Sequence, residues 1–204
     1  MSIPLRIIGG SKLSVTLIRT DNTDLDSKIT LRSSRLPDKD EISVLDAFSS
    51  DGLIWSKVKK QNPNITFKIA RIDTSGSRKG FYVRAKNERF LKVTDLNIYD
   101  VIDLDAYGVP FRQLEILFES SIITPTTIFV TFNIIGMMSM PAKMLQLLGF
   151  TREMHDISPT LMSREHEEKI FGYLYLRGVR EAYKISREDK AGYHCYLSFI
   201  IGEE

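Results

Sequence analysis

The stretch ISVLDAFSSDGLIWSKVKKQNPNITFKIARID, residues 42–73, has the pattern of a strand, a turn, a helix and a second strand. Its opening, Ile42–Phe48, is short and largely apolar, which is typical of a parallel strand buried on both faces. The turn SSDG follows, and Ile54 and Val58 then lie one helical turn apart until the tripeptide NPN ends the helix. The second strand is Thr66–Asp73. This unit predicts an α/β fold built on a parallel sheet.

The alternation of strands and helices continues to the end of the sequence. Further strands are expected at Phe81–Ala85, Tyr99–Asp105 and Thr126–Ile135, and helices at 87–95, after Pro110, from Pro141 to Gly149 and from Ser163 to Gly178. The last two strands, Val179–Ser186 and Tyr193–Ile201, are joined by a short turn and are therefore expected to be antiparallel. The pattern predicts an open three-layer α/β sandwich with a mostly parallel sheet and a C-terminal antiparallel hairpin.

The length of 204 residues and the hydrophobic content of 43% favour a single domain over residues 1–204. Residues 42–204 form its expected core. Residues 1–40 are expected to be an extension in which KLSVTLIRT, Lys12–Thr20, and KITLRSS, Lys28–Ser34, form the two strands of a hairpin.

Several classes of protein are disfavoured by composition. No segment approaches the roughly 20 apolar residues that span a bilayer, so no membrane association is expected. The first ten residues have neither the basic nor the apolar region of a signal peptide. A lone cysteine, Cys195, suits a reducing, cytoplasmic setting, and the three histidines lack metal-ligand spacing, so a metal-free protein is expected.

The net charge of +2 is unevenly distributed along the chain. Residues 57–92 contain eleven Lys and Arg against two acids, whereas residues 93–121 contain six acids against one base, Arg112. One interpretation is two solvated faces of opposite sign. The other is a basic surface beside an acidic cleft, which would suit a polyanion such as RNA or DNA.

Four polar side chains, Asp46, Asp73, Asn87 and Asp105, lie at or next to the ends of predicted strands. Ligands of open α/β sheets bind beyond the carboxyl ends of the strands, near the point where the strand order reverses. The four side chains are therefore the first candidates for a binding site.

The segment VLDAFSSDG, Val44–Gly52, resembles the first motif of Rossmann-like (class I) S-adenosylmethionine (SAM) dependent methyltransferases. The resemblance implies SAM as the cofactor and a Rossmann-like methyltransferase fold. It also implies that Asp73, which ends the second strand, accepts hydrogen bonds from the ribose hydroxyls. The cofactor-binding residues implied are Asp46, Phe48, Ser50, Gly52, Asp73 and Asn87. Ser50 stands where the first glycine of the motif usually lies, and Lys86-Asn87 replaces an acid followed by a small residue.

The segment DVIDLDAYGVP, Asp100–Pro110, resembles the fourth motif of amino-directed nucleic-acid methyltransferases and, more closely, the version found in tRNA guanine-N2 dimethyltransferases. The resemblance implies that Asp105 accepts hydrogen bonds from the acceptor amine and that Tyr107 stacks on the base. The substrate-binding residues implied are Asp103, Gly108, Pro110 and Arg112. Ala106 departs from the motif, which has a proline there.

The sequence thus predicts a SAM-dependent methyltransferase acting on an exocyclic amine of a nucleic-acid base, flipped out or single-stranded. The alternative is a methyltransferase-like domain that has lost catalysis and serves as a binding or scaffold module. A third interpretation treats DVIDLD as metal-binding acids of a nuclease or phosphotransferase, since Asp103 and Asp105 share one face of a strand.

Overall fold

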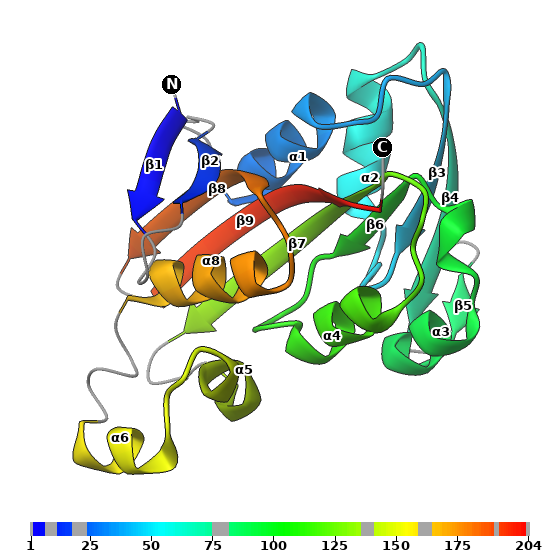
Figure 1. Ribbon diagram of the computed structural model, residues 1–204. Helices are drawn as coiled ribbons and strands as arrows, with labels where there is room; N and C mark the ends of the chain where they lie inside the picture. Colours follow the sequence, from blue (N-terminus) through cyan, green and yellow to red (C-terminus); the bar gives the residue numbers. More distant parts are fainter. Residues whose placement is uncertain are drawn as a thin grey trace.

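The computed structural model describes residues 2–6, 12–17, 24–74, 82–135, 141–158, 165–189 and 192–202. Within these ranges nine strands form one sheet, in the order β1-β2-β8-β9-β7-β6-β3-β4-β5 (Figure 1). The strands are β1 (Ser2–Arg6), β2 (Lys12–Leu17), β3 (Glu41–Asp46), β4 (Thr66–Asp73), β5 (Val83–Arg84), β6 (Val101–Leu104), β7 (Thr126–Ile135), β8 (Glu181–Asp189) and β9 (Gly192–Ile201).

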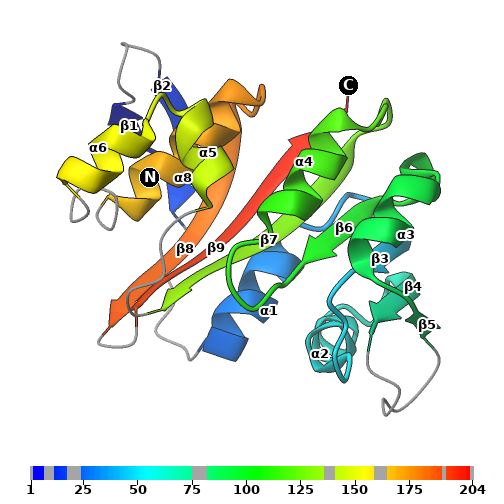
Figure 2. The same cartoon turned by 90° about the horizontal axis from the view of Figure 1, so that it is seen from below.

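Helices cover both faces of the sheet. They are α1 (Asp24–Ser34), α2 (Leu53–Gln61), α3 (Asn87–Val93), the 3-10 helix η1 (Leu96–Ile98), α4 (Phe111–Glu119), α5 (Ala142–Leu147), α6 (Arg152–Ile157) and α8 (His166–Leu176). In Figure 2, α1 and α2 lie on one side of the sheet, and α3, α4 and α8 on the other. The predicted three-layer α/β sandwich is confirmed. No helix in the described part of the chain is long and apolar enough to cross a membrane.

The central strands are parallel and the final hairpin is antiparallel, as predicted. β3 pairs in parallel with both β4 and β6, and β6 pairs in parallel with β7. β9 lies between β7 and β8 and is antiparallel to both. All four residues of β6 are buried, because helices cover both sides of this strand.

Each face of the sheet has its own hydrophobic core. On one face, buried side chains of α3, α4 and α8 pack on the central strands, with Leu91, Leu114 and Phe171 among them. On the other face, Ile29 of α1 and Trp55 of α2 pack against the sheet. The ring of Trp55 meets those of Phe67 and Phe129 at centroid distances of 6.1 and 6.2 Å. Trp55 thus joins α2 to the sheet.

The prediction of a strand over Lys28–Ser34 is wrong, because this segment belongs to α1. Ile29 and Leu31 alternate like strand residues, but the helix buries Ile29 and Arg32, which are three residues apart and share one helical face. Acids in the first turn, Asp24 and Asp26, favour a helix start through the helix dipole. Of the expected pair of strands the first is present over Lys12–Leu17 as β2, which pairs antiparallel with β1 and parallel with β8, while residues 18–20 lie outside the described residues.

The smaller departures concern element ends. β5 is two residues long, shorter than the predicted strand at 81–85, and pairs with Ile72 and Asp73 of β4. α8 begins at His166, while the predicted first residue of this helix, Ser163, lies outside the described residues.

Candidate functional site

The strand order reverses at β3. From β3 the chain proceeds to β4 and β5 on one side and later to β6 and β7 on the other, so the switch point lies between β3 and β6. Asp46 ends β3, Asp73 ends β4, and Asp105 follows β6 directly. The three carboxylates therefore meet at the edge of the sheet where ligands of open α/β folds bind.

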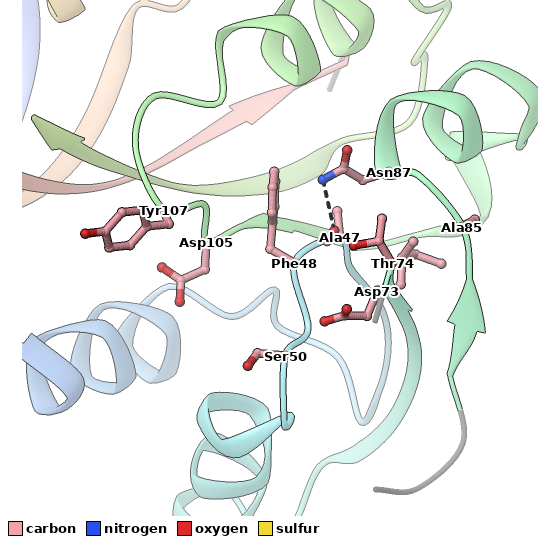
Figure 3. Close-up of a pocket in the computed structure, with 10 residues that line it drawn as sticks. Ala47, Phe48, Ser50, Asp73, Thr74, Ala85, Asn87, Asp105 and Tyr107 are labelled. Atoms are coloured by element: carbon pink, nitrogen blue, oxygen red, sulfur yellow. Dashed lines mark hydrogen bonds between the residues drawn. The ribbon is translucent and has the colours of Figure 1, made fainter. Parts of the chain in front are cut away.

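A cavity of about 300 Å³ opens at this edge (Figure 3). It is lined by Ala47, Phe48, Ser50, Ile72, Asp73, Thr74, Ala85, Asn87, Asp105 and Tyr107. Asp105 and Tyr107 lie at one end, and Asp73, Asn87 and Ala85 toward the other (Figure 3). The volume is at the lower end of the range of about 300–1,000 Å³ typical of small-molecule sites. The cavity joins residues that the sequence assigned to cofactor and to acceptor.

A smaller cavity of about 50 Å³ lies beneath the loop that follows β3. Asp46, Gly52 and Asp103 line it, and Phe48, Ser50 and Asp105 line both cavities. Burial and the neighbouring carboxylates Asp103 and Asp105 raise the pKa of Asp46 well above its usual value.

The loop after β3 has an unusual backbone. Ser50 has a φ of 45°, so it takes up the left-handed conformation although it is not a glycine. Gly52 has a φ of 73°, and a Cβ built there would lie 2.7 Å from Cζ of Arg71. Arg71 donates from Nη2 to the Ser50 carbonyl at 3.1 Å. Ser50 thus adopts a backbone conformation that favours glycine. For a residue with a side chain this conformation typically costs about 1–3 kcal/mol of conformational free energy.

Asn87, at the start of α3, connects three elements around the cavity. Its Nδ2 donates to the Ala47 carbonyl at 3.4 Å, the bond drawn in Figure 3. Its Oδ1 accepts from Gln113 Nε2 of α4 at 3.1 Å and from the Glu88 amide at 2.8 Å. These contacts hold Asn87 in a fixed orientation at the cavity wall.

Asp103 is enclosed by the protein. Arg32 donates to it from Nη2 at 2.6 Å and from Nε at 2.7 Å, and Trp55 Nε1 donates at 2.7 Å. The side chains of Arg32 and Asp103 are each 1% exposed. Burial raises the pKa of Asp103, and the Arg32 guanidinium opposes this shift. Asp103 therefore has a structural role, since its oxygens accept from Arg32 and Trp55, and its expected role in binding substrate stays a prediction.

Asp105 is held by two residues that the sequence did not single out. Lys28 Nζ lies 2.7 Å from Oδ1 and 3.0 Å from Oδ2, and Thr131 Oγ1 of β7 donates to Oδ1 at 2.6 Å. Burial alone would raise the pKa of Asp105, but Arg32, Lys28 and Thr131 together hold it below its usual value. Asp105 is therefore ionised at neutral pH. Lys28 was missed because its segment was predicted to be a strand remote from the site.

The loop from Asp105 to Pro110 is fixed from β7. The Asn133 amide donates to the Gly108 carbonyl at 2.9 Å, and Asn133 Nδ2 donates to the Ala106 carbonyl at 3.3 Å. Gly108 has a φ of 107°, a backbone conformation that favours glycine. These bonds restrain the loop although Ala106 stands in place of the motif's proline.

The residues of this loop and of the first turn of α4 differ in their exposure to solvent. Tyr107 is 87% exposed at the cavity rim. Gly108 and Pro110 are buried in the turn that leads into α4, and Arg112 is exposed on α4. Gly108, Pro110 and Arg112 line neither of the two cavities described above.

Each acid of DVIDLD has a cation beside it. Asp100, just before β6, contacts Lys39 Nζ at 2.5 Å and accepts from the Ser43 amide at 2.7 Å. Asp103 and Asp105 are paired with α1, as above. Among the described residues no group of three or more His, Cys, Asp or Glu is arranged to hold a metal ion. The acids of this segment are thus paired with cations of the protein itself.

The basic segment, residues 57–92 with their eleven Lys and Arg, borders the cavity at the edge of the sheet. Its described residues lie on α2, β4, β5 and α3. Arg84, Lys86, Arg89 and Lys92 are exposed, and Lys68 forms an exposed ion pair with Glu41. Lys86 directly precedes Asn87, so positive charge adjoins the cavity on the side of α3.

No protein-family model and no curated protein matches the sequence. Among solved structures, a protein of Bordetella parapertussis described as a possible exported protein superposes with a TM-score of 0.52 at 10% identity, covering 88% of this chain and 67% of that one. A candidate class I SAM-dependent methyltransferase of Listeria monocytogenes superposes with a TM-score of 0.50 at 10% identity, covering 88% of this chain and 59% of that one.

The carbon methyltransferase CurJ also gives a TM-score of 0.50, at 12% identity, covering 89% of this chain and 56% of that one. The chain therefore spans between about half and two thirds of the length of these three proteins. At such identities the likeness concerns the fold alone. The chain has the fold of class I SAM-dependent methyltransferases.

Proposed function

We propose that this protein is a SAM-dependent methyltransferase whose acceptor is an exocyclic amine of a nucleic-acid base. The observation that carries the proposal is the cavity at the switch point. In one space it joins Asp73, suited to a ribose, with Asp105 and Tyr107, suited to an amine and an aromatic ring.

The residues present fit the cofactor. Asp73 offers a carboxylate that accepts two hydrogen bonds from a vicinal diol, and it lies on the strand next to β3. The loop Phe48–Gly52 brings backbone close to the cavity, and Asn87 closes the wall toward α3. When bound, SAM would supply a methyl group activated by its sulfonium.

Asp105 and Tyr107 would orient the acceptor. The ionised Asp105 carboxylate accepts a hydrogen bond from an amine and so directs the nitrogen lone pair toward the methyl group. The exposed ring of Tyr107 offers a face on which a base stacks. Positioning of this kind provides much of the rate of such a transfer, because the reacting atoms are held in line and close together.

The nucleic-acid part of the proposal rests on charge. The exposed Arg84 and Lys86 are next in the chain to the lining residues Ala85 and Asn87 and would contact phosphates, which makes binding salt-dependent. A base within a duplex cannot reach the cavity, so the substrate would be single-stranded or would present a flipped base.

Calorimetric titration with SAM tests the cofactor. We expect saturable binding that weakens at least about tenfold in Asp73→Ala, because the loss of two hydrogen bonds to a ligand corresponds to about 1–3 kcal/mol. A matched control is Asp95→Ala, which removes an exposed acid that caps η1. No binding at millimolar SAM would contradict the enzymatic proposal.

Methyl transfer from labelled SAM to single-stranded RNA and DNA oligonucleotides tests the acceptor. Incorporation into the amine of one base is expected, and its loss in Asp105→Asn with SAM binding retained would assign the step to Asp105. Transfer to proteins or small molecules only would contradict the nucleic-acid acceptor.

A second function is favoured by one observation, the occupation of Asp105 by Lys28 and Thr131. In this version the domain binds nucleic acid without transferring a methyl group. Salt-dependent binding of oligonucleotides together with failure to bind SAM would identify it.

A further inference from the structure

Two ion pairs join α1 to the end of β6, and the spacing of the cations along the helix matches the spacing of the acids along the strand. Lys28 and Arg32 are four residues apart on a helix, which places them about 6 Å apart along its axis. Asp103 and Asp105 are two residues apart, about 6.7 Å along an extended chain. Arg32 pairs with Asp103 and Lys28 with Asp105, so the helix runs opposite to the strand and its spacing fits both acids.

The two pairs differ in burial. Arg32 and Asp103 are almost inaccessible, and Arg32 also donates from Nη1 to the Lys28 carbonyl at 3.0 Å and lies 5.5 Å from the centre of the Phe129 ring. This pair fixes the backbone of α1 at Lys28. The side chains of Lys28 and Asp105 are 19% and 12% exposed, and Asp105 lines both cavities. Asp105 of the second pair therefore faces the site, and Lys28, which lines neither cavity, adjoins the site through its contact with Asp105.

We propose that Lys28 is a specificity-determining residue of the acceptor site, contributed by α1 and acting beside Asp105. The inference rests on the proposed function and names the group that the site recognises. Asp105 accepts from the acceptor amine, and Lys28 donates to a lone pair directly beside that amine. On adenine, cytosine or guanine this lone pair belongs to the ring nitrogen next to the carbon that bears the exocyclic amine.

The geometry of Asp105 supports this arrangement. A carboxylate has about four lone-pair sites. Oδ1 is in contact with both Thr131 and Lys28, while Oδ2 has only the longer contact to Lys28 among the contacts described above. An incoming amine can therefore bond to Oδ2 while Lys28 stays in place. A simple alkyl ammonium would instead compete with Lys28 for the same charge, and it has no lone pair for Lys28 to contact.

The test compares Lys28→Met and Lys28→Arg with a matched control, Lys39→Met. Lys39 also pairs with an aspartate beside β6, but Asp100 lies at the other end of the strand, away from both cavities. The probes are single-stranded oligonucleotides that carry the accepted base, and partners in which a CH group replaces the ring nitrogen beside the amine. SAM binding is measured for every variant, and thermal melting verifies that each is folded.

In the unaltered protein, the parent base should be methylated at least about tenfold faster than its deaza partner, because a site built to hydrogen-bond a group rejects the analogue that lacks it. In Lys28→Met this ratio should fall close to one while SAM affinity changes less than about threefold. Lys28→Arg should keep part of the ratio, and Lys39→Met all of it.

Each other outcome has a defined meaning. Equal rates for parent and deaza bases in the unaltered protein, or an unchanged ratio in Lys28→Met, would overturn the role of Lys28 and leave the proposed function intact. SAM binding without transfer to any oligonucleotide would overturn both the acceptor class and this inference. Failure to bind SAM would overturn the proposed function itself.

Discussion

Two buried carboxylates of this protein have similar partners and different surroundings. Asp103 of β6 accepts from Arg32 and Trp55. Glu115 of α4 accepts from Tyr173 Oη and from Arg177 Nη2, each at 2.5 Å, and Lys143 Nζ lies 3.4 Å away. Glu115 joins α4 to α8 on the opposite face of the sheet and lines neither of the cavities at the switch point.

The comparison shows that an acid paired with arginine is not by itself a sign of function. The Asp103 pair is part of the site because it positions α1, whose Lys28 reaches Asp105. The Glu115 cluster has the same chemistry and joins two helices away from the candidate site. Location relative to the switch point separates the two, and mutations should separate them in the same way.

The largest effect is expected for Arg32→Met. It leaves the Asp103 carboxylate buried without its cation, which typically costs about 3–5 kcal/mol. Urea denaturation followed by the fluorescence of Trp55 measures the loss. The double variant Arg32→Met/Asp103→Leu removes both charges and should recover much of the stability. It should discriminate less between the parent base and its deaza partner, because Lys28 is no longer fixed. A single variant as stable as the unaltered protein would contradict the anchoring role.

A smaller effect is expected for Glu115→Gln. The amide of glutamine has the shape of the Glu115 carboxylate but lacks the charge that pairs with Arg177. We therefore expect the free energy of unfolding to fall by about 1–3 kcal/mol. Affinity for SAM should remain unchanged, in contrast to any change at Asp73. Tyr173→Phe, which removes only the hydroxyl donor, is the matched control and should cost less. A change in cofactor affinity would show that the two faces of the sheet are coupled.

The smallest effect is expected for the stability of the folded protein at acidic pH, through the ion pair of Lys28 and Asp105. The pKa of Asp105 is lowered in the folded protein, so the pair with Lys28 contributes stability that is present above the usual aspartate pKa of about 4 and is lost as pH falls through the lowered value. Between pH 7 and 5 this contribution should be constant. Denaturation curves below pH 4 should show a shallower acid dependence for Asp105→Asn than for the unaltered protein. Equal acid dependence would show that the pair adds nothing to folding.

Much of the fold and of the cavity could be predicted because the evidence is local. The apolar runs of β3 and β7 mark strands by composition, and acids at strand ends are visible in the sequence. Once the order of strands is assumed, Asp73 and Asp105 are expected at the same edge. These features depend on residues close together in the chain.

The cations from α1 could not be predicted in this way. Arg32 and Asp103 are 71 residues apart, and Lys28 and Asp105 are 77 apart, so no local pattern links them. The alternation of Ile29 and Leu31 also favours a strand over short range, whereas both side chains are buried from a helix, in the core that contains Trp55 and Phe129. The sequence therefore could not show that Arg32 and Trp55 bind the carboxylate of Asp103.

The pairing of β2 with β8 has a consequence for how the chain folds. Ser14 lies opposite Glu181, so a strand near the start of this sequence completes its bonding only with a strand near the end. Contacts of such long sequence separation carry a large loop-closure entropy and slow folding. During synthesis, β2 would remain without its parallel neighbour until β8 has emerged. We therefore expect the sheet around the site to form first and the β1–β2 edge to join it last.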